Sequence, residues 1–121
     1  MIGGVKTPWK LARHGTKDTG RLRSAKHLAW IRRQPCILAH ERLGDEGQVQ
    51  AAHVRTGTDA GLSAKPSDCW VVPLCFTHHQ IQHQIGEAEL ERRCKIDLKA
   101  LALSFAKRSP VKEIRERANE P

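Results

Sequence analysis

With 121 residues, only 4% of them aromatic and none of them tyrosine, the chain has length for one small domain and few large side chains to fill it, so a bound metal is an expected source of stability. Its net charge of +8 and pI near 9.8 indicate a polyanionic partner, nucleic acid or an anionic membrane surface. No apolar run approaches the roughly 18 to 20 residues of a spanning helix and no apolar signal segment opens the chain, which disfavours secretion and membrane insertion and indicates a cytoplasmic protein that faces nucleic acid.

Residues 1–23 have the composition of a basic, flexible tail, rich in glycine and with Asp18 as its only acid. A tail of this kind binds phosphates without reading base sequence, although a solvated tail without a role is the alternative. Its candidate DNA-binding residues are Lys6, Lys10, Arg13, Lys17, Arg21 and Arg23.

The first helix is expected over SAKHLAWIRRQP, where Ser24 can cap a partial apolar stripe that a proline ends. Valines and small residues in QVQAAHVR predict a strand, and CWVVPLC predicts a second strand, whose proline indicates either a sheet edge or a strand end. The loop between them is about a dozen residues long and rich in Gly, Ser, Asp and Pro. The two strands are therefore expected to pair as a long-looped hairpin.

A helix over THHQIQHQIG follows the hairpin, with its two isoleucines facing the core and Gly86 ending it. One further amphipathic helix is expected over about residues 87–107, and residues 110–121 are expected to form a charged C-terminal tail. The apolar side of that last helix consists of Leu90, Cys94, Leu98, Leu101 and Phe105. The predicted fold class is α+β, a small ββα core flanked by N-terminal and C-terminal helices.

Two histidines of the predicted helix after the hairpin, His79 and His83, are four residues apart and therefore project from one face within reach of one ion. Imidazole suits zinc, nickel, manganese or iron, and two protein ligands leave positions open for water and substrate. The alternative interpretation is a polar helix face that binds no ion.

Cys75 and His78 have the Cys-x2-His spacing of half a zinc knuckle. A structural site needs four ligands, and Cys36 with His40 is the expected second pair. The alternatives are a small buried side chain for Cys36 and a solvent-facing loop residue for His40. Without an export signal all four cysteines are expected to be reduced or metal-bound. Cys69 and Cys94 are expected in the core, although Cys69 is also a possible substitute ligand.

His53 ends the first predicted strand, and folding the hairpin onto the helix places it across from His79 and His83. A neutral imidazole in that position can take a proton from water, and an ion facing it can stabilise charge on a phosphate and on the leaving oxygen. Arg55 and Lys65 are placed to hold the phosphodiester. This set of residues predicts metal-assisted hydrolysis of a nucleic-acid backbone.

The stretch AAHVRTGTDAGLSAKPSDCWVVPLCFTHHQIQHQIG resembles the HNH, or ββα-metal, nucleases, and more narrowly the small phage and prophage HNH proteins that include the RecA-dependent nuclease Ref. The resemblance covers about residues 26–110 and implies an HNH nuclease domain, which we place at residues 24–109. It also implies DNA as partner, a RecA-type recombinase as a further partner, and a phage or prophage gene expressed in a bacterial cell. The implied cofactors are a structural zinc and a catalytic Mg, Mn or Zn ion.

The resemblance implies a role for each matched residue. His53 takes the place of the general base, and His79 and His83 take those of the two ligands of the catalytic metal. Asp68 stands in the loop that supplies the middle polar residue of the HNH pattern, where it either orients His53 or approaches the metal. At the structural zinc the matched residues are Cys36, Cys75 and His78.

The chain departs from the pattern at two alanines. Ala39 stands where the fourth zinc ligand is a cysteine, so His40 is recruited or the site is incomplete. Ala52 stands where many relatives have a metal-binding His or Asp, which leaves Asp68, water or the substrate phosphate to complete the catalytic site. The leading hypothesis is a metal-dependent DNA endonuclease with little sequence preference. The alternative, which Ala52 favours, is a non-catalytic zinc-stapled DNA-binding or adaptor module with the same fold.

Overall fold

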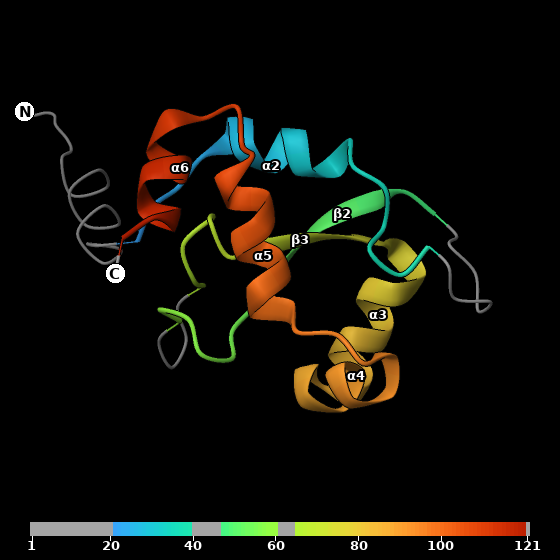
Figure 1. Cartoon of the computed structure of the whole chain (residues 1–121). Coiled ribbons are helices and arrows are strands. Elements are labelled where there is room, and N and C mark those ends of the chain that lie inside the picture. The colour runs from blue at the N-terminus through green and yellow to red at the C-terminus, as the bar shows by residue number, and fades with distance from the viewer. Residues whose placement is uncertain (1–20, 40–46, 61–64, 121) are drawn as a thin grey trace, which may run out of the picture.

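The computed structural model describes residues 21–39, 47–60 and 65–120. Within these ranges the chain forms a two-stranded antiparallel sheet and five helices, which confirms the predicted α+β class (Figure 1). In chain order the elements are α2 (Ala25–Arg32), β2 (Val49–His53), β3 (Val71–Cys75), α3 (Phe76–Ile85), α4 (Glu87–Cys94), α5 (Leu98–Lys107) and α6 (Lys112–Ala118). No helix in this part of the chain is long and apolar enough to cross a membrane.

The hairpin is the centre of the fold, and its register runs from Val49 opposite Cys75 to His53 opposite Val71. Every residue of β3 is buried, because helices lie against it from both sides. Toward α2 and α5, Val71 packs with Ile31 and Phe105. The predicted hairpin is confirmed, and both of its strands are edge strands of a two-stranded sheet.

The helix after the hairpin begins at Phe76, one residue before the predicted stretch, and ends at Gly86 as predicted. Cys75 is the N-cap of α3, and its Sγ accepts a hydrogen bond from the amide of His78. Gly86 ends the helix with a φ of 88°, a conformation that favours glycine because it has no Cβ. The chain therefore turns sharply into α4, and α3 is held as a short helix against the hairpin (Figure 1).

The prediction of one helix over residues 87–107 is wrong, because the chain forms α4 and α5 instead. Lys95 adopts the left-handed conformation with a φ of 58° and ends α4. Asp97 then caps α5 by accepting a hydrogen bond from the amide of Ala100. The break allows Leu90 and Leu98 to enter the same buried cluster although the two helices point in different directions.

The predicted tails are also partly wrong. Residues 112–118 form α6, whose Ile114 is fully buried beside Cys69 and Ala106. At the other end, the backbone of Leu22 bonds to Ser67 Oγ and to the amide of Asp68, so the last residues of the predicted basic tail belong to the folded part. The domain limits 24–109 stay a prediction. Four of the tail's candidate DNA-binding residues lie outside the described ranges: Lys6, Lys10, Arg13 and Lys17.

Candidate functional site

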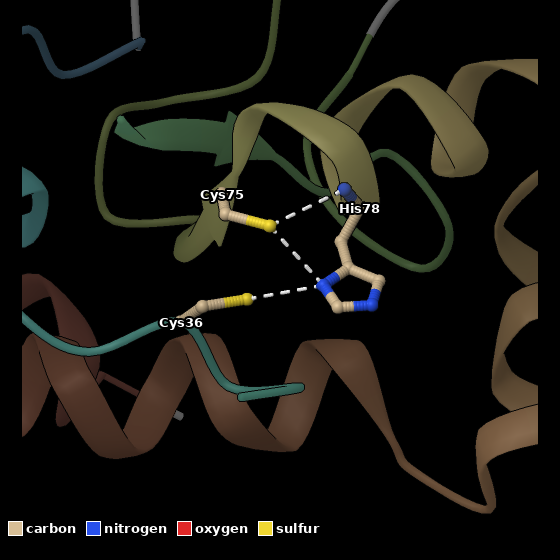
Figure 2. Close-up of side chains that lie close together, drawn as sticks. All are labelled: Cys36, Cys75 and His78. Atoms are coloured by element: carbon tan, nitrogen blue, oxygen red, sulfur yellow. Dashed lines mark hydrogen bonds between the residues drawn. The ribbon is translucent and has the colours of Figure 1, made fainter. Parts of the chain in front are cut away.

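Three buried side chains converge at the junction of β3 and α3. One ligand atom from each of Cys36, Cys75 and His78 lies within 4.8 Å of the others. The two sulfur atoms point toward Nδ1 of His78, at 3.5 Å from Cys36 and 3.2 Å from Cys75 (Figure 2). Sulfur and nitrogen ligands of a tetrahedral zinc, with bonds of about 2.3 and 2.0 Å, lie about 3.5 Å apart. The cluster therefore has the dimensions of three corners of a zinc site and could hold such an ion.

Local backbone structure places both cysteines. Cys75 ends the strand and caps α3, whereas Cys36 is brought to it because Ile37 N donates to the carbonyl of Pro73 at 3.0 Å. Each sulfur also accepts a hydrogen bond from a backbone amide that follows it in the chain. Leu38 N donates to Cys36 Sγ at 3.4 Å, and His78 N donates to Cys75 Sγ at 3.5 Å. Amide donors of this kind favour the thiolate form that a metal requires.

Burial sets the protonation of the donor set. Burial raises the pKa of the Cys36 thiol to about 11, and backbone hydrogen bonds lower it only in part, so an ion must replace a proton there. His78 Nε2 is buried and has no hydrogen-bond partner among the described residues.

The structure describes three of the four predicted zinc ligands. Among the described residues no fourth His, Cys, Asp or Glu joins the cluster. His40 lies outside the described ranges, and its role stays a prediction. Cys69 is 1% exposed in the cluster around Ile114 and is a core residue as expected, whereas Cys94 is half-buried and packs against the cluster around Leu98.

His79 and His83 meet on another face of α3. Their Nε2 atoms lie 3.2 Å apart, which confirms that the two rings share a helix face. Two imidazole nitrogens on a tetrahedral zinc lie about 3.3 Å apart, so the spacing fits one ion. Burial lowers the pKa of His79, and the charges of His83 and His53 lower it further. His79 is thus held in the neutral form that binds metals.

One residue of this site was missed from the sequence. Gln50 on β2 accepts a hydrogen bond through Oε1 from Nδ1 of His79 at 2.6 Å. The alternation of a strand places Gln50 on the same face as Ala52, which is fully buried and binds nothing. That alternation was the available signal, but a lone glutamine in a strand carries no metal-ligand spacing. The described residues offer no third protein ligand to His79 and His83.

His53 is fixed by a buried carboxylate. Its Nε2 lies 2.9 Å from Oδ1 of Asp68, which is 3% exposed. The amide of Ser24 donates to Oδ2 at 2.8 Å, and Arg23 Nη1 lies 3.3 Å from Oδ1. Burial by itself raises the pKa of Asp68, but the bonds from His53 and Ser24 and the nearby positive charges bring it below its ordinary value. Asp68 is therefore ionised at neutral pH and contacts His53 directly.

A hollow at the surface contains both His53 and His83. It is lined by His53, Arg55, Thr56, Gln82, His83, Gly86 and Glu87. Gln82 Nε2 donates to the carbonyl of His53, which ties the end of β2 to α3. Arg55 and Lys65 are exposed, whereas Arg23, expected to bind DNA, is engaged with Asp68. Arg21 is half-buried.

Comparison with known proteins places the chain in a family. Residues 16–108 match the model of a family described as a protein of unknown function (DUF968), and the chain belongs to it. A search of curated proteins and a search of solved structures gave no match. The matched range contains every candidate ligand as well as His53 and Asp68.

Proposed function

We propose that this member of the DUF968 family is a metal-dependent endonuclease that hydrolyses DNA phosphodiester bonds with little sequence preference, on a ββα core of the HNH type. One observation carries the proposal. A histidine bonded to a buried carboxylate, His53 to Asp68, shares a hollow with His83, whose Nε2 lies 3.2 Å from that of His79. A structural role alone requires no oriented histidine beside an imidazole pair with metal-ligand spacing.

His53 is the general base of the proposed reaction. Because ionised Asp68 can only accept a hydrogen bond, Nε2 of His53 carries the proton between them. Nδ1 of His53 is then the nitrogen that takes a proton from water. Asp68, held by Ser24 N and Arg23, fixes the ring orientation and favours the imidazolium that forms. The geometry thus supports the orienting role for Asp68 over a role as metal ligand.

His79 and His83 would hold the catalytic ion. A bound Mg, Mn or Zn ion supplies electrostatic stabilisation of the charge that develops on the phosphate and on the leaving oxygen. Since Asp68 is engaged with His53 and Ala52 is buried, the remaining positions belong to water and substrate. Cys36, Cys75 and His78, with His40 as the predicted fourth ligand, would hold a zinc that fixes the β3 to α3 junction and with it His79.

DNA is the proposed partner because the chain carries a net charge of +8, and phosphate contacts give affinity without sequence reading. Arg55 in the hollow and Lys65 nearby in the chain are the proposed phosphate contacts of the described part. A RecA-type recombinase as a second partner, a phage or prophage origin, and a cytoplasmic location in the bacterial host are further proposals that rest on the resemblance alone.

A nicking assay tests the proposal. Supercoiled, single-stranded and displacement-loop DNA would be incubated with the purified protein and Mg, Mn or Zn. Loss of a general base is expected to slow cleavage by about 10²- to 10⁴-fold in His53→Ala. Gln84→Ala, at an exposed position of α3, is the matched control and is expected to cleave like wild type. Equal nicking rates for wild type and His53→Ala would refute the catalytic role.

The second candidate is a non-catalytic zinc-stapled DNA-binding or adaptor module. It is favoured by Ala52, which leaves His79 and His83 without a third protein ligand among the described residues. Metal analysis separates the two. One tightly held zinc with no exchangeable second ion, together with DNA binding that weakens steeply with salt, would support binding alone.

A further inference from the structure

We infer that Gln50 is a positioning residue that prepares His79 to bind an ion through Nε2, and that ion binding then displaces the Nε2 proton of His83. Neither the family description nor the resemblance assigns a role to Gln50. The inference rests on the proposed function, because it treats His79 and His83 as ligands of the exchangeable ion. Two hydrogen bonds link these three side chains in series.

The first bond sets the tautomer of His79. Gln50 Oε1 is a carbonyl oxygen that can only accept, so Nδ1 of His79, 2.6 Å away, must carry a hydrogen. In a neutral imidazole the other nitrogen then has no hydrogen and presents a lone pair. Nε2 of His79 is therefore in the form that coordinates metals, and the side chain on β2 holds the ring in place.

The second bond sets the tautomer of His83. Nε2 of His79 has no hydrogen, so at a separation of 3.2 Å the Nε2 of His83 must donate to it. An ion that takes both Nε2 atoms therefore replaces this hydrogen: the Nε2 proton leaves to water and Nδ1 of His83 takes one up, so the ring stays neutral and no net proton is released. His83 is exposed, so water can carry the proton between the two nitrogens. One ligand is thus prepared in advance, and the other changes its tautomer.

The position of Gln50 suits this role. It lies within β2, opposite Leu74 of β3, and is half-buried, so the strand fixes its backbone. Groups that accept the second N–H of a ligating histidine orient it and raise its basicity, and their loss lowers metal affinity by about 10- to 100-fold. A neutral amide polarises the ring less than a carboxylate does. Gln50→Glu is therefore expected to tighten ion binding and Gln50→Leu to weaken it.

The test measures metal binding and tautomers rather than cleavage. Protein carrying zinc only at the Cys36–Cys75–His78 cluster would be titrated with Co²⁺ by calorimetry at pH 8. Its histidine tautomers would be read from ¹⁵N NMR before Zn²⁺ addition and after it. Wild type is expected to show Nδ1–H on His79 and Nε2–H on His83, with Nδ1–H on both after the ion binds. Gln50→Leu is expected to bind Co²⁺ about 10- to 100-fold more weakly. Gln84→Leu on α3 is the control and should match wild type.

An Nε2–H tautomer of His79 in the ion-free wild type would overturn the inference, as would wild-type Co²⁺ affinity in a folded Gln50→Leu. Folding is checked by circular dichroism and by retention of the thiolate-bound zinc. If Gln50→Leu fails to fold, Gln50→Glu decides, because affinity equal to or below wild type contradicts the argument. Wild type that shows the tautomers and the Gln50 dependence but cleaves no DNA refutes the nuclease and leaves this inference standing. If the protein cleaves DNA but Co²⁺ binding does not depend on Gln50, the inference is refuted and the nuclease proposal stands.

Discussion

The Cys36–Cys75–His78 cluster lies in the interior of the molecule, where its three members are 4%, 0% and 2% exposed. The imidazole pair of His79 and His83 lies at the surface, with His79 half-buried and His83 exposed. The two groups are separated by a single peptide bond of α3. Side chains of consecutive helical residues point about 100° apart, so His78 can face the buried cluster while His79 faces the surface. Burial suits an ion that holds the fold together, and exposure suits an ion that exchanges with solvent and meets a substrate.

The largest effect on stability is expected from removing a ligand of the buried cluster. Structural zinc contributes on the order of 10 kcal/mol, similar to the roughly 5–15 kcal/mol that stabilises a whole domain. Cys75→Ala is therefore expected to lose most of its free energy of unfolding together with its zinc, as measured by thermal unfolding and metal content. Cys94→Ala, which changes a half-buried cysteine outside the cluster, is the control. A stable Cys75→Ala would reduce the cluster to ordinary core packing.

Replacing Asp68, which holds His53 in place, is expected to have an intermediate effect on the free energy of unfolding. Replacing it by Asn is expected to cost about 1–3 kcal/mol, because acceptors for His53 and Ser24 are weakened in a buried place. The pKa of Asp68 is lowered in the fold, so its contribution is present above the unfolded pKa near 3.9 and lost as the pH falls through the folded value.

Urea unfolding at pH 3 and pH 7 measures this dependence. The difference in stability between the two pH values is expected to shrink in Asp68→Asn. Asp97→Asn, at an exposed helix cap that Asn also fills, is the control and should keep the wild-type dependence. An unchanged pH dependence in Asp68→Asn would mean that other carboxylates dominate.

The thiol of Cys36 predicts a pH effect on zinc affinity. Its pKa of about 11 in the ion-free protein means that zinc displaces a proton from it at neutral pH. The proton of this one thiol is expected to lower the apparent affinity up to tenfold for each unit by which the pH is lowered, which corresponds to about 1.4 kcal/mol. Calorimetry in buffers of different ionisation enthalpy counts the protons released. Zinc binding without proton release would contradict a thiolate site.

The smallest effect on stability is expected at the exposed end of the imidazole pair. His83→Ala should change the free energy of unfolding by no more than about 0.5 kcal/mol, because the side chain is exposed. The same variant should lose the exchangeable ion while it keeps the thiolate-bound zinc, as measured by metal stoichiometry. A loss of stability as large as that of Cys75→Ala would abolish the distinction between the two sites.

Secondary-structure elements that are set by a few neighbouring residues could be predicted from the sequence. The Ser24 cap, both strands and the Gly86 end of α3 all follow from cap, strand and turn chemistry within a few residues. The division between α4 and α5 was missed because Lys95 is not a residue type that favours a left-handed helix end. Helix α6 was missed because its buried Ile114 stands among charges, and its stability comes from packing rather than propensity.

For the site, the chain alone determined which ligands share an element. Cys75, His78, His79 and His83 follow one another along a strand end and a helix, where backbone geometry sets their directions. Only the tertiary structure decided which residues come from elsewhere. Cys36 reaches the cluster through the bond of Ile37 to Pro73, Asp68 reaches His53 across the hairpin loop, and Gln50 reaches His79 through the strand register. Those contacts depend on how the hairpin packs on its helices, and no spacing within a single element encodes that packing.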